Sequence, residues 1–164
     1  MSKKIFEKLR KIKLVITIVI VAGVVTHLIL VYDAAKSIKV VEKRIEGVYL
    51  IKPNEYEVRF SLSIFNPKRD IEIDYINYDV YIEDDYLGNG EKPHFILKKG
   101  SSQYEFTLHF TSSSISSATK DLLLAGEANV KIKGEIMIPA KFFGTFTWKH
   151  IKIPYTINEK VGIG

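Results

Sequence analysis

The chain has 164 residues, a formal net charge of +5 and no cysteine. The missing cysteine excludes disulfides, thiol catalysis, cysteine-ligated zinc and a lipid-modified cysteine anchor. The length allows one membrane anchor and one domain of ordinary size.

The positive charge is concentrated at the N-terminus. Residues 1–32 contain six basic side chains and one acidic side chain, whereas residues 33–164 contain 18 of each. A nucleic-acid-binding domain carries a basic face, so the balanced charge of residues 33–164 argues against nucleic acid as a partner. A basic tail at residues 1–13 is typical of a segment beside anionic lipid headgroups on the cytoplasmic side of a membrane.

Residues 14–32 are predicted to form a transmembrane helix. Thirteen of these 19 residues are Leu, Ile or Val, and none is acidic, lysine or arginine. As a helix they reach about 28 Å, close to the ~30 Å hydrocarbon core of a bilayer. Their β-branched side chains favour a strand in water, but in lipid only a helix satisfies the backbone of an isolated segment. The predicted span begins at Leu14 and ends at Tyr32, and it includes Val19, Gly23 and His27.

The charges that flank the span predict its orientation. Six Lys or Arg residues precede it and four follow within fifteen residues. By the positive-inside rule the N-terminus is cytoplasmic and the remainder of the chain lies outside the cytoplasm. The alternative is a cleaved signal peptide, but such peptides have a shorter apolar core and a small-x-small cleavage site. We therefore expect an uncleaved, single-pass signal anchor in the cell membrane.

After the span we expect a connector at residues 33–42, a domain at 43–158 and a tail at 159–164. Residues 55–63 alternate between apolar and polar side chains, which predicts a half-buried antiparallel strand. Asn66 and Pro67 end this strand, since proline lacks the donor that a strand ladder needs. Residues 71–82 alternate but change phase, which predicts a bulge or a strand that crosses between two sheets.

One helix is expected among the later strands. Gly88, Asn89 and Gly90 are predicted to form a hairpin turn before it. Ser113 or Ser114 is expected to cap the helix, and Gly126 to end it. Its buried face is predicted to contain Ile115, Ala118, Leu122 and Ala125.

Residues 130–138 and 142–157 complete the pattern as strands, the second with a change of phase near His150. Seven or more strands, with turn signals about every ten residues, are typical of an antiparallel β-sandwich. The predicted fold class is thus all-β with one short helix, preceded by a single transmembrane helix.

A set of short motifs accompanies this pattern: an Asn-Pro turn, an Asn-Tyr-Asp segment, a Gly-Asn-Gly and a Gly-Ser-Ser segment, and a glycine inside a strand. Their positions are Asn66, Pro67, Tyr78, Asp79, Gly88, Gly90, Gly100 and Gly134. With this set, residues 43–157 resemble the LEA14-like proteins, also called late embryogenesis abundant type 2 or water-stress and hypersensitive-response domain proteins. The resemblance implies an immunoglobulin- or fibronectin-III-like sandwich, a link to desiccation or other stress, no catalytic residues and no cofactor.

His27 is the only ionisable side chain within the predicted span. Ionisable residues inside membranes often have a functional role. A neutral histidine near the outer boundary of the bilayer costs little free energy, however, so no functional role is expected for His27. With Gly23 and Thr26 it is also a candidate for a helix–helix contact, although no second glycine completes a GxxxG pattern.

Carboxylates and histidines in the domain give no recognisable metal site. Four carboxylates gather in one expected hairpin, and their oxygens are ligands that calcium prefers. Their spacing differs from that of an EF-hand, so a solvated acidic hairpin is expected. The three domain histidines are far apart and form no metal-binding motif. These residues are Glu83, Asp84, Asp85 and Glu91, and His94, His109 and His150.

The richest aromatic cluster consists of Phe142, Phe143, Phe146 and Trp148. Because Phe143 has the opposite parity to the other three, this strand has aromatic side chains on both faces. We expect burial on both faces near the change of phase; the alternative is an exposed contact patch for a partner or an apolar ligand.

The sequence favours a non-enzymatic, membrane-anchored domain outside the cytoplasm, with a binding or stress-related role. No nucleophile, base or metal set indicates an enzyme. An accessory subunit that docks onto a membrane complex and a carrier of lipid or another apolar ligand are the two alternatives. An exposed edge strand or aromatic patch would favour docking, and a large apolar cavity would favour the carrier.

Overall fold

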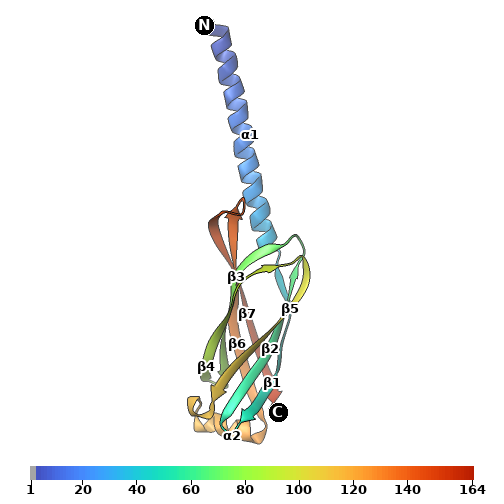
Figure 1. Ribbon diagram of the computed structural model, residues 1–164, viewed down its shortest axis with the longest axis vertical. Coiled ribbons are helices and arrows are strands. Elements are labelled where there is room, and N and C mark those ends of the chain that lie inside the picture. The colour runs from blue at the N-terminus through green and yellow to red at the C-terminus, as the bar shows by residue number, and fades with distance from the viewer. Residues whose placement is uncertain (1–2) are drawn as a thin grey trace.

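A single long helix, α1, projects from one end of a β-sandwich in the computed structural model, which describes residues 3–164 (Figure 1). α1 spans Lys3–Lys36 and is the one helix of the described chain that is long and apolar enough to cross a membrane. The predicted cytoplasmic tail at residues 1–13 is helical from Lys3 onward, and its first two residues lie outside the described part.

The joint between α1 and the sandwich is short and packed. Val31, Ala35 and Ile38 belong to the hydrophobic core of the sandwich, and Ala35 is completely buried. The Asp33 carboxylate lies 3.2 Å from the Lys68 ammonium in the turn after the second strand. The expected connector at residues 33–42 is therefore divided between the last turn of α1 and the first strand, because its small and apolar side chains complete the core.

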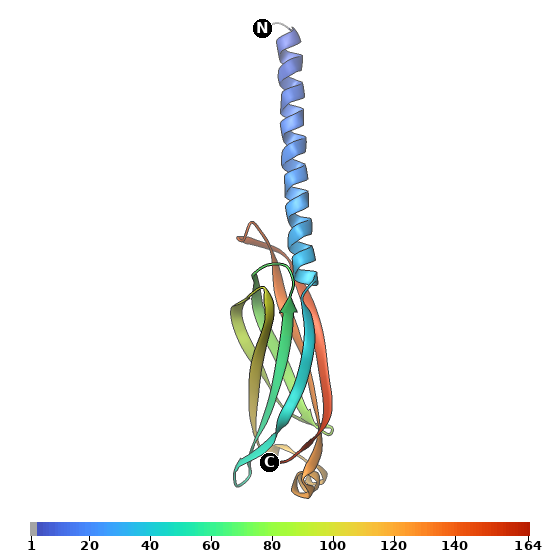
Figure 2. The same ribbon diagram turned by 90° about the vertical axis from the view of Figure 1, so that its right-hand side faces the viewer.

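Seven antiparallel strands form two packed sheets (Figures 1 and 2). One sheet has the order β1-β2-β5 and the other β4-β3-β6-β7. The strands are β1 Lys39–Lys52, β2 Glu55–Asn66, β3 Ile71–Ile82, β4 Asp85–Leu97, β5 Gly100–Thr111, β6 Glu127–Phe142 and β7 Phe146–Gly162. This architecture confirms the predicted all-β sandwich with one short helix. The strands extend the domain to residues 39–162, beyond the expected 43–158.

The core lies between the sheets and follows the alternation of the sequence. On β2, Val58, Phe60, Leu62 and Ile64 are completely buried, as their period of two predicts. They face apolar side chains of β3 and β6 in the other sheet. The 28 buried residues of this single cluster extend from α1 to the C-terminal strand, so the helix and the sandwich share one core.

β3 does not cross between sheets, so that alternative is wrong. It pairs with β4 from Ile71 to Ile82, and a register shift falls between Val80 and Tyr81. The change of phase itself is real, since Ile73 and Ile76 are both fully buried. It occurs where Pro93 of β4 lies opposite Tyr75, and proline has no N–H for the ladder.

The short helix α2, Ser117–Ala125, begins later than predicted. Ser116 caps it, whereas Ser113 and Ser114 belong to a 3-10 turn, η1, at Ser112–Ser114. The Asp85 carboxylate explains this shift, because it accepts hydrogen bonds from Ser116 and from the Thr119 hydroxyl. The helix therefore buries Thr119 and Leu123. Of the residues predicted to be buried, Ile115, which precedes the helix, is buried, whereas Ala118, Leu122 and Ala125 are exposed. Gly126 ends the helix in the left-handed conformation, as predicted.

Gly88, Asn89 and Gly90 lie inside β4, so the predicted hairpin turn is wrong. The turn is Glu83 and Asp84, with Glu83 in the left-handed region at φ 53°. Gly90 is opposite Tyr78, and a methyl group at Gly90 would overlap the Tyr78 ring.

Gly134 has the same kind of role on the other side of β3. It also lies opposite Tyr78, and a methyl group there would overlap Tyr155 and the Asn77 carbonyl. These two glycines thus make room for aromatic side chains.

Candidate membrane-proximal interaction site

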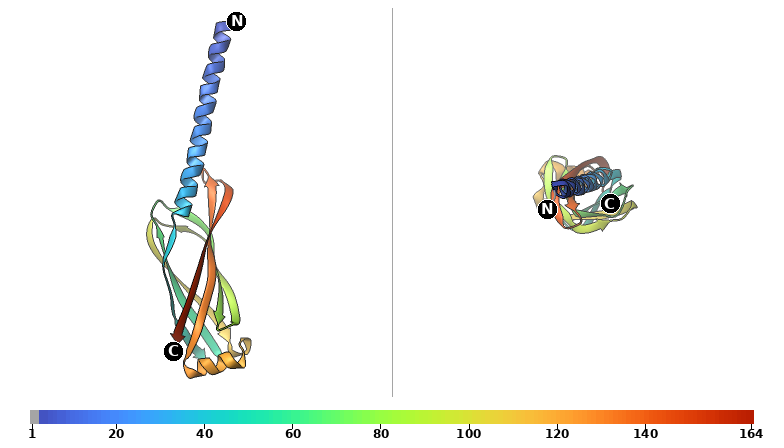
Figure 3. Two further views of the ribbon diagram at one scale, coloured as in Figure 1. Left: turned by 180° about the vertical axis from the view of Figure 1, so that it is seen from behind. Right: turned by 90° about the horizontal axis from the view of Figure 1, so that it is seen from above.

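The two ends of the sandwich differ. α1 enters at one end, together with the turns after β2 and β4, whereas α2 and the C-terminus lie at the distal end (Figures 1 and 3). The loop between β6 and β7 extends past the α1 joint and lies beside the helix (Figure 3). We call residues 142–148, at the tip of these two strands, the aromatic hairpin.

His27 connects α1 to the aromatic hairpin. Its ring stacks on that of Phe143, with centroids 4.1 Å apart and planes 8° apart, and meets the Phe142 ring edge-on at 5.7 Å. The Phe143 backbone N–H donates a hydrogen bond to His27 Nε2 at 3.0 Å. The structure therefore brings together two features that the sequence places 116 residues apart.

Most of the aromatic hairpin is exposed. Phe143 and Phe146 keep 63% and 65% of their accessible surface and Trp148 keeps 38%, whereas Phe142 is half-buried. The expected burial on both faces is wrong for these three residues, because the hairpin extends beyond the sandwich and no second sheet covers it. Phe143 at φ 47° and Gly144 at φ 73° form the tight turn that presents the rings.

The aromatic hairpin lies level with the predicted span. His27 is five residues before Tyr32, which ends the apolar run. At 1.5 Å per residue this offset is about 7.5 Å along the helix. Lys141 and Lys149 bracket the hairpin, and the seven residues between them carry no charge.

Tyr32 forms the base of the site. The ammonium groups of Lys36 and Lys149 lie 4.9 and 5.0 Å from the centre of its ring, and Trp148 is 6.4 Å away. Cations close to an aromatic face are attracted by its quadrupole. An aromatic pair beside lysines is also the composition found where transmembrane helices leave the hydrocarbon core.

A cleft of about 300 Å³ separates α1 from the sandwich at this level. Its apolar wall contains His27, Val31 and Phe143, and its charged wall contains Arg69, Asp70, Glu72 and Lys141. The Lys141 ammonium is 2.6 Å from the Glu72 carboxylate. The cleft therefore combines apolar surface with charged side chains of both signs.

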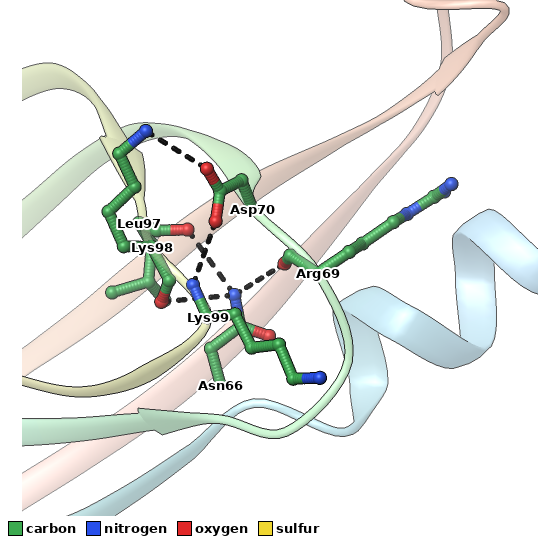
Figure 4. A network of polar contacts seen from close by, with 6 residues as sticks. All are labelled: Asn66, Arg69, Asp70, Leu97, Lys98 and Lys99. Atoms are coloured by element: carbon green, nitrogen blue, oxygen red, sulfur yellow. Dashed lines mark hydrogen bonds and ion pairs between the residues drawn. The ribbon is translucent and has the colours of Figure 1, made fainter.

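A buried amide fixes the two turns beside this cleft (Figure 4). Asn66 is completely buried, and its Nδ2 group donates to the carbonyl oxygens of Arg69, Leu97 and Lys98 at 2.6, 3.3 and 3.4 Å. The Arg69 side chain points away from this network (Figure 4). The family motif position Asn66 therefore has a structural role, which is to join the turn after β2 to the turn after β4.

Asp70 strengthens the same connection. Its carboxylate accepts a hydrogen bond from the Lys99 backbone N–H and pairs with the Lys98 ammonium, each at 2.9 Å. The hydrogen bond from the Lys99 N–H has the larger effect, and together with the Lys98 ammonium it holds the pKa of Asp70 below its ordinary value. The turns at the α1 end are thus linked through both an amide and a carboxylate.

The carboxylates of the acidic hairpin do not converge. Glu83 accepts hydrogen bonds from Asn129, and Asp85 from residues at the start of α2. His94, His109 and His150 each lie beside one carboxylate, of Glu72, Glu57 and Asp74 respectively. Within residues 3–164 no three such side chains form a group that could hold a metal ion.

Three contributors to the site are missing from the sequence prediction: Arg69, Lys141 and Lys149. The two lysines carry a signal that could have been used, since they stand at equal distances from the centre of an uncharged aromatic stretch. Arg69 has no such signal, because only the packing of α1 against the sandwich places it on the cleft.

Solved structures with this fold come from distant organisms. A protein from Archaeoglobus fulgidus is 8% identical, with a TM-score of 0.52 over 76% of this chain and 97% of its own. The solution structure of AT1g01470 from Arabidopsis thaliana is 14% identical, with a TM-score of 0.55 over 76% of this chain and 80% of its own. At these identities the likeness concerns the fold alone. No curated protein sequence matches the chain.

The family model described as Late embryogenesis abundant protein, LEA_2, matches residues 61–157. The match extends from the middle of β2 to β7 and includes all eight motif positions that suggested the resemblance. Since it covers more than half of the chain, the chain belongs to the LEA_2 family of late embryogenesis abundant proteins.

Proposed function

We propose that this chain is a single-pass membrane protein that presents a non-enzymatic LEA_2 domain outside the cytoplasm. The uncovered apolar surface of α1 carries the proposal. Val19 and Ile20 keep more than half of their surface exposed, as do their neighbours. Only 6% of the most apolar 18-residue stretch of α1 is buried. Apolar surface of this extent requires lipid or another partner, and a helix is the form in which a lone segment crosses a bilayer.

The packing of the joint favours an anchor that is retained over a signal peptide that is removed. Val31 and Ala35 of α1 belong to the sandwich core. Cleavage after the apolar run would take Val31 out of that core and leave a cavity, which destabilises a folded domain. The basic residues before the span support a cytoplasmic N-terminus by the positive-inside rule.

Cysteine labelling tests this topology directly, because the natural chain contains no cysteine. Ser117 at the start of α2 and Lys11 before the span are both exposed. We expect a membrane-impermeant maleimide to label Ser117→Cys in intact cells and Lys11→Cys only after lysis. Carbonate washing should leave both proteins in the membrane.

Each contrary result has a distinct meaning. The opposite labelling pattern contradicts the orientation, and release by carbonate contradicts the anchor. A mature chain that lacks the Lys11→Cys label after lysis and runs at a lower mass indicates a cleaved signal peptide.

The proposed role in stress rests on family membership. Deletion of the gene is expected to lower survival after drying, and expression of the intact chain to restore it. Unchanged survival contradicts the stress role and leaves the topology untouched.

A docking role in a membrane complex is the second candidate. β4 and β5 are edge strands of their sheets, and such edges can pair with a strand of another protein. The carrier alternative has less support, since Phe60, Leu62 and Ile136 fill the space between the sheets as completely buried side chains.

A further inference from the structure

We propose that the aromatic hairpin, residues 142–148, enters the lipid bilayer beside α1 and gives the domain a second membrane contact. This inference rests on the proposed function, in which α1 spans the membrane. It assigns lipid as the occupant of a surface that is otherwise exposed: Phe143 at 63% and Phe146 at 65%.

The first argument is depth. The Phe143 ring stacks on His27, and His27 lies about 7.5 Å before the end of the apolar run by helix rise. When residues 14–32 occupy the hydrocarbon core, the hairpin that contacts His27 is below the outer boundary of that core.

The second argument is the distribution of charge. Residues 142–148 contain four aromatic side chains and no charged one, and Lys141 and Lys149 flank them on the side of the sandwich. Lysines of this kind keep their ammonium groups among the headgroups, and tryptophan and tyrosine favour the same level. Trp148 and Tyr32 lie beside Lys149, at the level that the headgroups would occupy.

The third argument concerns the backbone of the turn, whose polar groups must have partners in lipid. The Phe143 N–H donates to His27 Nε2 at 3.0 Å. Both the Thr145 N–H and its hydroxyl donate to the Phe142 carbonyl at 3.1 Å. His27 thereby gains a role within the span, which is to satisfy a donor that would otherwise enter the membrane unpaired.

Continuity with α1 favours lipid over a protein partner. The aromatic hairpin contacts α1 at His27, and the helix near this contact has exposed apolar side chains, among them Ile29 and Leu30 at 61% and 58%. A protein partner that covered only the hairpin would leave the apolar side chains of α1 exposed to water. A bilayer covers both.

The chain contains a single tryptophan, Trp148, which makes fluorescence a specific test. The test protein is the full chain with Phe146→Trp and Trp148→Phe, reconstituted in phosphatidylcholine–phosphatidylglycerol vesicles. The matched control carries Tyr86→Trp and Trp148→Phe, because Tyr86 is exposed at the distal end of β4. Each protein is measured in vesicles with and without bromine on the lipid acyl chains.

We expect brominated lipid to quench the tryptophan at position 146 several-fold more strongly than the tryptophan at position 86, with a blue-shifted emission. Wild-type Trp148 should be quenched to an intermediate extent, and this measurement needs no substitution in the hairpin. Equal quenching at positions 146 and 86, with no quenching of wild-type Trp148, overturns the inference.

Carbonate washing of the same vesicles separates the two proposals. Protein that stays in the vesicles without quenching at position 146 contradicts the hairpin contact and leaves the anchor intact. Protein that is washed away contradicts the anchor itself. Thermal unfolding of each variant, close to that of the wild type, confirms that the substituted domains are folded.

Discussion

The Phe143 N–H donates to His27 Nε2 at 3.0 Å while the two rings stack 4.1 Å apart. This pair joins α1 to the tip of the β6–β7 hairpin. His27→Ala removes both the acceptor and the stacking surface. A lost hydrogen bond of this kind costs about 1 kcal/mol, which corresponds to a roughly fivefold larger equilibrium population of the open turn.

Hydrogen–deuterium exchange of the full chain in detergent micelles measures this effect. Amides at residues 142–146 should exchange faster in His27→Ala, while amides of β2 keep their rate. The control is Thr26→Ala, an exposed neighbour on the same helix. Equal exchange of the hairpin in all three proteins would show that His27 does not hold it.

Asn66 provides the clearest prediction for stability. Asn66→Ala leaves three carbonyl oxygens at the α1 end without the amide that they share. Unsatisfied buried polar groups cost about 1–3 kcal/mol. Urea unfolding followed by circular dichroism should show a loss within this range, whereas Asn158→Ala at an exposed position of β7 should be nearly neutral. A neutral Asn66→Ala would contradict the proposed structural role of this motif position.

The glycines beside Tyr78 are predicted to be necessary for sheet packing. Gly90→Ala and Gly134→Ala each place a methyl group where an aromatic side chain already lies. Overpacking of this kind costs about 1–3 kcal/mol. Gly162→Ala is the matched control, because the nearest atom to its methyl group, the Gly126 carbonyl oxygen, is at an ordinary 3.9 Å. Midpoints of thermal unfolding should fall for the first two variants and stay unchanged for the third.

Acid should weaken the start of α2. Hydrogen bonds from the Thr119 hydroxyl and from Ser116 hold the pKa of Asp85 below its ordinary value of 3.8. A carboxylate with a lowered pKa in the folded state stabilises the protein above its unfolded pKa, and this stabilisation is lost as the pH falls through the folded pKa. Asp85→Asn should therefore be less stable than the wild type at neutral pH, and the difference should shrink below pH 3.8.

Urea midpoints measured from neutral to acidic pH test this expectation. Asp84→Asn, at the adjacent exposed position, is the control. A difference between Asp85→Asn and wild type that is constant with pH would contradict the role of the ionised carboxylate.

The features that the sequence predicted well depend on local periodicity. The prediction for β2 is correct because the alternation of apolar and polar residues marks the buried face of a strand, regardless of which element covers that face. Val58, Phe60 and Leu62 on this face are completely buried. The apolar helix is equally local, and the left-handed end of α2 at Gly126 follows from the glycine itself.

The incorrect features depend on contacts between distant residues. The start of α2 is set by Asp85, which lies 31 residues before Ser116. Gly90 suggested a turn, but it is required by Tyr78 on the next strand. The exposure of Phe143 and Phe146 follows from the extension of β6 and β7 beyond the other strands, which alternation within one strand does not reveal.

The packed joint has a mechanical consequence. Only Ser37 and Ile38 separate α1 from β1, and the Ser37 N–H and hydroxyl are hydrogen-bonded to the carbonyls of Asp33 and Ala34. A rotation of the helix is therefore transmitted to the whole sandwich as a rigid body. Because transmembrane helices tilt to match the thickness of the bilayer, a thinner membrane would incline the long axis of the domain and bring its far pole closer to the lipid surface.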